Sequence, residues 1–456
     1  MNDLLGKTLM TTFMHAPVLG EVDICQDALI EIDDNGQINA VVRPSDDLYE
    51  QMKSEARDSG CLVQLPSHQF LLPGFVDLHI HAPQWPQLGK ALDVPLEVWL
   101  MEHTFPLEAR YIDVNFARRI YTDMVSSLLA NGTTTALYFA TIHEGATQLL
   151  ADTCLDLGQR ALIGKVVMDN KDQCPDYYRD KSTELALSET ESFIDYVKSH
   201  EGNTADLIKP VITPRFIPSC TDEALLGLGK LAQTHKCHVQ THCSESNWEH
   251  NYVLERTGVT DTQALTDFGL MGRHTILAHS NFISEQDMDI IAEKGAGIAH
   301  CPLSNIYFSN AVFPLRRALE KSLHVGLGTD ISGGSSASIL DVCRYSIHMS
   351  RVLEEGTDPD KPADERGVAN TRIDFREAFY LATTGGAKAL DLPVGRFEKG
   401  CMFDAILVAP DAKSAPILLD DELDTLDEQL QKIVYLATRS NITSTWVSGK
   451  NVMSAV

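Results

Sequence analysis

Eight short apolar runs, each followed by a polar segment with helical periodicity, constrain the fold of this 456-residue chain more than any other feature. Strands that alternate with helices build a parallel sheet, and eight such units in succession are typical of a (β/α)8 barrel. The pattern therefore predicts an α/β fold with a TIM-like barrel, although periodicity alone also allows a doubly wound open sheet. The runs lie at 75–79, 133–139, 161–167, 209–215, 238–242, 275–279, 296–300 and 325–330.

The two ends of the chain differ from this alternating middle. Near the N-terminus, strand-like runs flank the dipeptide Asn35-Gly36, which predicts a hairpin turn. Short strand-like runs also occur near the C-terminus. We therefore expect a small β-sandwich domain assembled from both termini beside the barrel. The expected division is 1–70 and 391–456 for the small domain and 71–390 for the barrel.

Charge and composition exclude several classes of partner. The 37 Lys and Arg against 64 Asp and Glu give a formal net charge of −27, which repels nucleic acid and anionic membrane surfaces. No apolar stretch approaches the roughly 20 residues needed to span a bilayer, and we expect no secretory signal. The 10 Cys form no C-x-x-C pair, which favours a reducing, cytoplasmic location over a disulfide framework.

Five of the eight runs end on a residue that can bind a metal ion or move a proton. The C-terminal ends of barrel strands converge on one face, where active sites lie. Strand alternation also places both imidazoles of His79-Ile80-His81 on the same side. Nitrogen and carboxylate ligands without thiolate suit Zn²⁺, with Fe²⁺ as the alternative. The residues at the five ends are His79 with His81, His242, His279, His300 and Asp330.

Because these ligands come from separate strands, they favour a catalytic ion over a structural one. Such an ion lowers the pKa of its water toward about 7 and so supplies hydroxide near neutral pH. Glu245 follows His242 by three residues and is a candidate proton carrier between water and a leaving nitrogen. The alternative role for Glu245 is a first-turn carboxylate that stabilises the next helix.

Several motifs around these strand ends match a known family. Residues 73–81, Pro-Gly-Phe-Val-Asp-Leu-His-Ile-His, resemble the first-strand motif of the amidohydrolase superfamily. Gln84, the Thr-Phe-Pro at 104–106 and the Thr-Pro-Arg-Phe at 213–216 are more specific and resemble the guanine deaminase family. The resemblance extends over most of the chain, from about Leu71 to the C-terminal motifs at 397–400 and 403–405. It implies a mononuclear, metal-dependent deaminase.

The resemblance assigns catalytic roles to three residues. Asp330 would accept the proton of the attacking water, and Glu245 would protonate the purine ring and then the departing amine. His279 would lie beside the water and the substrate, although it is a ligand in some members of the superfamily. The implied ligands of one zinc ion per chain are His79, His81, His242 and Asp330.

The same resemblance implies the substrate and its binding residues. Gln84 and Arg215 would bind the hydrogen-bonding edge of guanine, because a guanidinium fork suits the acceptors O6 and N7. Metal-activated hydroxide would attack C2 of guanine and release ammonia and xanthine, a step of purine catabolism or salvage. The resemblance also implies a homodimer. The full set of expected substrate contacts is Gln84, Arg215, Phe216, His242, Glu245 and Asp330.

The same residues allow other functional interpretations, some of which the sequence disfavours. Two-metal relatives need a bridging carboxylated lysine at the end of the fourth strand, where this chain has Arg215, and Lys165 is predicted to lie mid-strand. A mononuclear relative that deaminates or dechlorinates another aminated heterocycle is the main alternative. A non-catalytic scaffold is least favoured, because every expected position is filled. Cys243 should point away from His242 and is not expected to bind the ion.

Overall fold

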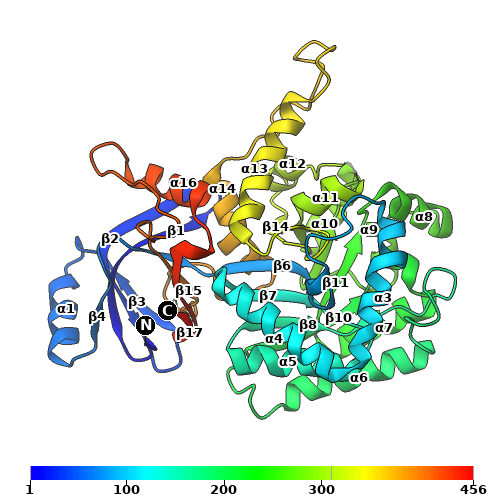
Figure 1. Ribbon diagram of the computed structural model, residues 1–456, viewed down its shortest axis with the longest axis horizontal. Coiled ribbons are helices and arrows are strands. Elements are labelled where there is room, and N and C mark those ends of the chain that lie inside the picture. Colours follow the sequence, from blue (N-terminus) through cyan, green and yellow to red (C-terminus); the bar gives the residue numbers. More distant parts are fainter. Residues whose placement is uncertain (1, 310, 455–456) are drawn as a thin grey trace.

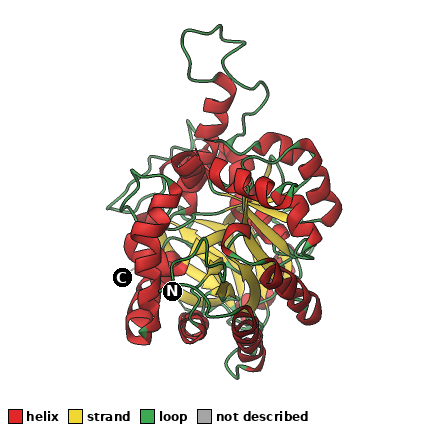
Figure 2. Ribbon diagram, turned by 90° about the vertical axis from the view of Figure 1, so that its right-hand side faces the viewer, coloured by secondary structure: helices red, strands yellow, loops and turns green. Residues whose placement is uncertain are grey.

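The computed structural model describes residues 2–309 and 311–454 and has two parts (Figure 1). One part is a barrel of strands surrounded by helices, seen more nearly end-on in Figure 2. The other is a sheet beside the barrel, where both chain termini lie (Figure 1). Among the described residues, no helix combines the length and the apolar character needed to cross a bilayer.

The barrel strands are parallel and follow the chain order β6-β7-β8-β10-β11-β12-β13-β14, as the eight apolar runs predict. The chain after β14 closes the circle onto β6, because Asp330 N donates to His79 O (2.8 Å) and His81 N donates to Ile331 O (3.0 Å). The barrel prediction is therefore confirmed over the open sheet. The strands are β6 (Phe75–His81), β7 (Thr133–Phe139), β8 (Arg160–Gly164), β9 (Val166–Val167), β10 (Ile208–Pro214), β11 (His238–Cys243), β12 (Thr275–His279), β13 (Gly297–His300) and β14 (His324–Leu327).

Helices follow the strands and cover the barrel. In α4 (Val114–Ala130), the Asp113 side chain caps the N-terminus by accepting from the backbone of Asn115, and α10 (Glu285–Lys294) begins with a capping box of Ser284 and Asp287. The other helices after the strands are α5 (Glu144–Leu157), α6 (Thr183–Ser199), α7 (Asp222–His235), α8 (Asn247–Thr257), α9 (Asp261–Asp267), α11 (Pro302–Ser309), α12 (Leu315–Glu320), α13 (Ile339–Glu355), α14 (Phe375–Tyr380) and α15 (Gly386–Ala389).

The packing of α4 shows how the helices are held. Its buried face carries Tyr121, Met124 and Leu128, which share one apolar cluster with Ile80 of β6 and Tyr138 of β7. Burial of a large apolar side chain contributes about 1.5–3 kcal/mol relative to an exposed position. This helix therefore fixes the strand from which His79 and His81 project.

The small domain is one sheet of eight strands that joins both ends of the chain, in the order β17-β16-β15-β5-β1-β2-β3, with β4 paired to β1. The predicted hairpin forms β2 and β3, with Ile32 opposite Ile38. This agrees with the predicted small β domain built from both termini. Hydrogen bonds join its strands into one sheet, and bulges in β1 bend that sheet. Its elements are β1 (Thr8–Val18), β2 (Glu21–Ile32), β3 (Ile38–Val42), α1 (Tyr49–Asp58), β4 (Leu62–Gln64), β5 (Phe70–Pro73), β15 (Ala405–Val408), α16 (Leu426–Leu436), β16 (Ile442–Val447) and β17 (Lys450–Ser454).

Two connections position the site. Gly74 alone separates β5 of the sheet from β6 of the barrel, so the domain boundary predicted after residue 70 falls at the first residue of β5. Between β6 and α4 the chain forms the cap segment, residues 82–112, which is built from short helical turns. These turns are η1 (Ala82–Gln87), α2 (Leu96–Trp99), η2 (Leu100–Thr104), α3 (Phe105–Glu108) and η3 (Ala109–Ile112).

Candidate active site

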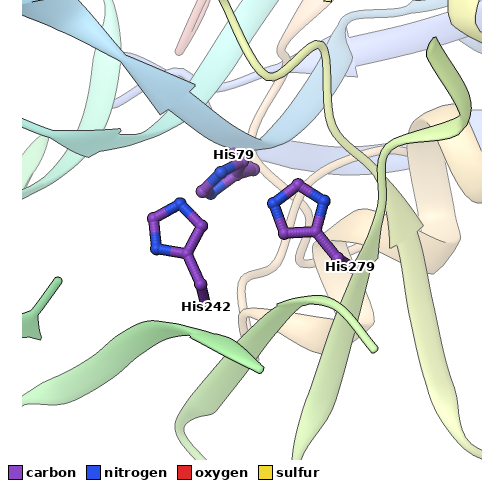
Figure 3. A group of neighbouring side chains, drawn as sticks. All are labelled: His79, His242 and His279. Carbon is purple, nitrogen blue, oxygen red and sulfur yellow. The ribbon is translucent and has the colours of Figure 1, made fainter. Parts of the chain in front are cut away.

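Four histidines from three barrel strands converge at the C-terminal end of the barrel. His79 and His81 lie on β6, His242 on β11 and His279 on β12. Figure 3 shows the rings of His79, His242 and His279 facing one another. The ring centroids of His79 and His242 are 4.9 Å apart, and Nε2 of His81 lies 3.0 Å from Nε2 of His242. The structure therefore brings together side chains that the sequence places at separate strand ends.

Asp330, just after β14, directs its carboxylate into this cluster. Its Oδ1 lies 3.2 Å from His79 Nε2 and 3.6 Å from His81 Nε2, and its Oδ2 lies 3.9 Å from His279 Nε2. Asp330 and His279 both have left-handed backbone conformations, with φ of 49° and 70°. Such strained residues persist only where the surrounding structure holds them, and they are frequent in active sites.

The imidazoles of the cluster are in a protonation state that allows them to bind a cation. Burial and neighbouring imidazoles lower the pKa of His79, His81 and His242 well below the ordinary value, so these rings are neutral. His242 Nδ1 lies 2.6 Å from the backbone oxygen of Arg215, and this contact requires a proton on Nδ1. The lone pair of His242 is therefore on Nε2, which faces the cluster.

The same tautomer holds at His279, whose Nδ1 lies 2.8 Å from Oδ1 of Asn305. Nε2 of His79 and Nε2 of His279 are buried without a hydrogen-bond partner among the described residues. Buried ring nitrogens without a partner in the protein are suited to a metal ion or to water bound beside one. The donor set, nitrogen and carboxylate oxygen without thiolate, fits a divalent ion such as Zn²⁺.

Glu245 lies beside this cluster, on the loop after β11. Its side chain is buried, and Oε1 lies 3.7 Å from His279 Nε2. Burial, together with the nearby charge of Asp330, raises the pKa of Glu245 well above its ordinary value. The helix-stabilising alternative is wrong: α8 has Ser246 as its N-cap, and its first-turn carboxylate is Glu249, which accepts from the Glu245 backbone N–H (2.7 Å).

A pocket opens onto this cluster. Three of its walls come from the cap segment, from α11 and from the loop after β10. Flat apolar walls with a few converging polar groups are typical of a site for an aromatic heterocycle. The pocket is lined by His81, Gln84, Leu96, Trp99, Leu100, Arg215, Phe216, His242, Glu245, Phe308, Asp330 and Gly333.

Arg215 and Gln84 share a buried carboxylate that the sequence analysis missed, that of Glu108 in α3. Arg215 donates from both terminal nitrogens to Glu108, at 2.7 and 3.1 Å, and Gln84 Nε2 donates to it at 2.9 Å. Arg215 therefore forms a buried ion pair, not an exposed one. The available signal was Glu108 itself, an acidic residue just after the Thr-Phe-Pro motif.

Three other residues from the sequence analysis lie outside the cluster. His300 ends β13, but its ring packs on Phe313 at 5.4 Å, and burial lowers its pKa to about 3. Cys243 is buried with Sγ 3.8 Å from Thr262 Oγ1. Lys165 lies between β8 and β9, not within a strand, and its Nζ is 2.9 Å from Asp180 Oδ1.

Comparison with known proteins shows the family to which this chain belongs. The amidohydrolase family matches residues 70–452, and the chain belongs to that family. The guanine deaminases of Dictyostelium discoideum and Homo sapiens are 37% and 36% identical to it, over 98% of this chain and 98% and 97% of theirs. Within the family, the chain is therefore grouped with the guanine deaminases.

A solved structure agrees with this grouping. Guanine deaminase from C. acetobutylicum, with bound guanine in the active site, has a TM-score of 0.86 and 30% sequence identity to this chain. The similarity covers 98% of this chain and 100% of that one. Fold and sequence thus lead to the same group of enzymes.

Proposed function

We propose that this protein is an enzyme that hydrolyses guanine to xanthine and ammonia. The observation that carries the proposal is the arrangement of the pocket. One side presents His81, His242, Asp330 and Glu245, which suit hydrolysis together with the buried His79 and His279 behind them. Another side presents Gln84 and Arg215, which suit the polar edge of a purine. The similarity to guanine deaminases supports the same substrate.

We assign one divalent metal ion, zinc, to the cluster, held by His79, His81, His242 and Asp330. The buried lone pairs and the absence of thiolate among these side chains support zinc, with Fe²⁺ as the chemical alternative. When bound, such an ion supplies the Lewis acidity that makes water a nucleophile near neutral pH.

The chain's own acidic residues manage the protons. Asp330 accepts a proton from the water that adds to C2 of guanine. Glu245, whose pKa is raised by burial, donates its proton to the ring nitrogen next to C2, takes up the proton of the new C2 hydroxyl and passes it to the departing amine. The proton held by Asp330 then returns to Glu245. His279 lies within 3.7 Å of Glu245 and 3.9 Å of Asp330, where it contacts both the water and the substrate. The C2–O bond forms, the C2–N bond breaks, and ammonia leaves.

Substrate recognition falls to the pocket walls. Arg215 and Gln84 donate hydrogen bonds to acceptors of the purine such as O6 and N7. Phe216 lines the same pocket and packs against the ring, supported by Trp248 at 5.8 Å between ring centroids. His242, Glu245 and Asp330 contact the purine from the metal side.

An ammonia-release assay on protein of known metal content tests the proposal. Guanine, adenine, cytosine, guanosine and melamine-type triazines form the panel. We expect ammonia from guanine, with xanthine as product, at about one zinc or iron per chain. Ammonia from a different heterocycle alone would keep the hydrolytic site but refute guanine as substrate. Metal-loaded protein that releases ammonia from no compound would refute the proposal.

We also propose a cytoplasmic homodimer. All ten cysteines are free thiols, which suits a reducing compartment. Apolar side chains are exposed near α13 and α16, where a second copy could cover them: Tyr345, Val352, Leu418, Leu423 and Leu436. Light scattering after size exclusion should give twice the 50.3 kDa chain mass.

A further inference from the structure

Glu108 has no role in the chemistry described above, yet it is fully buried beside the pocket. Both of its oxygens are used. Oε1 accepts from Arg215 (3.1 Å) and from Gln84 Nε2 (2.9 Å), and Oε2 accepts from Arg215 (2.7 Å). Three segments that are far apart in sequence, α3, the end of β10 and η1, therefore meet at one carboxylate.

Balancing the charge of Arg215 explains only part of this arrangement. A buried guanidinium requires a counter-ion, and the bidentate pair with Glu108 provides it. The bond from Gln84 to Glu108 is not needed for charge balance, because an amide is neutral. The contact with Gln84 must therefore have another role.

That contact fixes the orientation of the Gln84 amide. Gln84 Oε1 accepts from the backbone N–H of Ser332 at 3.1 Å, while Nε2 donates to Glu108. The reverse orientation would place oxygen against the Glu108 carboxylate and nitrogen against the Ser332 N–H. Both contacts would be repulsive, so only one orientation is satisfied.

The pocket wall held by Glu108 is consequently rich in donors. Arginine carries five N–H groups, of which Glu108 takes two, and the Gln84 amide nitrogen carries a second hydrogen. A carbonyl oxygen facing this wall finds donors. An amino group at the same place would direct its own N–H groups at the donors of Arg215 and Gln84 and leave these buried donors without acceptors. A polar site discriminates strongly against such a ligand.

We propose that Glu108 is a positioning residue that sets the selectivity for an oxygen over an amino group at position 6 of the purine. It acts by holding Arg215 and Gln84 with their donors toward the substrate. This inference rests on the proposed guanine deaminase function. Glu108 touches neither the reacting carbon nor the metal ligands in this scheme, so its loss should affect binding more than turnover.

The test uses full-length, metal-loaded enzyme and two purines with the same 2-amino group, guanine and 2,6-diaminopurine. The variants are Glu108→Gln and Glu108→Asp, with Glu102→Gln, an exposed residue of the same cap segment, as the matched control. The readouts are kcat and KM for guanine and the apparent Ki of 2,6-diaminopurine. KM and Ki do not depend on the fraction of active enzyme, so partial unfolding does not distort them.

For Glu108→Gln we expect KM for guanine to rise by about 10- to 100-fold, the loss of a hydrogen bond to a charged group. The value of kcat should change by about threefold or less, because uniform binding is lost. The Ki of 2,6-diaminopurine should stay unchanged or fall. The ratio of this Ki to the KM for guanine, which measures the selectivity for oxygen at position 6, should therefore decrease. Glu102→Gln should match the wild type, and Glu108→Asp should give an intermediate ratio.

Several results would overturn the inference. One is a wild-type ratio of Ki to KM in Glu108→Gln. Another is a loss of kcat at constant KM. If Glu108→Gln yields no folded protein, Glu108→Asp decides: a wild-type ratio with a lower Tm would reduce Glu108 to a counter-ion. Wild-type enzyme without activity on guanine would instead refute the proposed function, and this inference with it.

Discussion

The carboxylate of Asp77 accepts two hydrogen bonds from Thr329, one from the backbone N–H (3.0 Å) and one from the hydroxyl (2.6 Å). Asp77 precedes His79 by two residues on β6, and Thr329 directly precedes Asp330. The pair therefore ties the first barrel strand to the loop after the last one, beside the cluster of His79, His81 and Asp330. Burial raises the pKa of Asp77 to about 7, against the opposing effect of the bonds from Thr329.

Removal of the Thr329 hydroxyl should loosen the proposed metal site. In Thr329→Val the buried Asp77 carboxylate loses one donor, at a cost of about 1–3 kcal/mol. We expect a lower Tm and faster loss of metal during dialysis against a chelator. Thr329→Ser keeps the hydroxyl and serves as the control, with near wild-type values. Identical metal loss in the two variants would show that this bond does not support the site.

Glu245→Gln should separate binding from chemistry. The amide fills the same space but cannot deliver a proton, so kcat should fall by about 10²- to 10⁴-fold. Metal content and guanine affinity, measured by elemental analysis and calorimetry, should be retained. Glu255→Gln, an exposed change in α8, is the matched control. Turnover that survives in Glu245→Gln would remove this residue from the mechanism.

Two substitutions at Arg215 should affect activity and stability differently. Arg215→Lys keeps the charge beside Glu108 but loses the fork, so kcat/KM for guanine should fall by about 10- to 100-fold. Arg215→Met also leaves Glu108 as an uncompensated buried charge, a penalty of about 3–5 kcal/mol. Thermal melts should therefore rank the lysine variant above the methionine variant. Equal Tm values would contradict a stabilising ion pair.

Acid sensitivity should be reduced by a change at His238, which begins β11 at the strand end opposite His242. Burial lowers the pKa of His238 to about 4, and its Nε2 is 2.9 Å from the Leu390 oxygen. An unfolded histidine has a pKa of about 6.5. Between these values the unfolded chain binds a proton that the folded chain does not, so stability is lost as the pH falls through this window.

His238→Gln keeps a donor near Leu390 but removes this titration. Its Tm should fall less than that of the wild type between pH 7.5 and pH 5 in scanning calorimetry. His348→Gln, an exposed change on α13, should follow the wild-type curve. Parallel curves for His238→Gln and the wild type would contradict the assigned pKa.

Local patterns in the sequence were sufficient to predict the barrel and to identify the residues at its strand ends. Apolar runs mark buried parallel strands, and the spacing of His79 and His81 places both on one face. His300 has the same local pattern as His242 and His279 but turns away to pack on Phe313. The segment that follows each strand determines whether the residue at the strand end joins the cluster. Local periodicity carries no information about the path of that segment.

Glu108 shows a second limit of sequence analysis. Its partner Arg215 lies 107 residues away, and the cap segment that carries Glu108 consists of short irregular turns without a clear period. The order of the strands in the small domain could not be predicted for a similar reason. The pairing of Leu72 with Ile406 joins distant parts of the chain, and alternation within a strand does not identify its neighbour.

The position of β5 has a consequence for synthesis of the protein on the ribosome. β5 lies between β1 and β15, and only Gly74 separates it from β6. Because chains emerge N-terminus first, one edge of β5 stays unpaired until residues 405–408 have left the exit tunnel. By then every side chain that we propose as a metal ligand has already been made. The nascent chain thus carries all the side chains that we propose as metal ligands well before β5, the strand joined to the first barrel strand by Gly74, is paired on both edges. A truncated chain would expose that edge to aggregation.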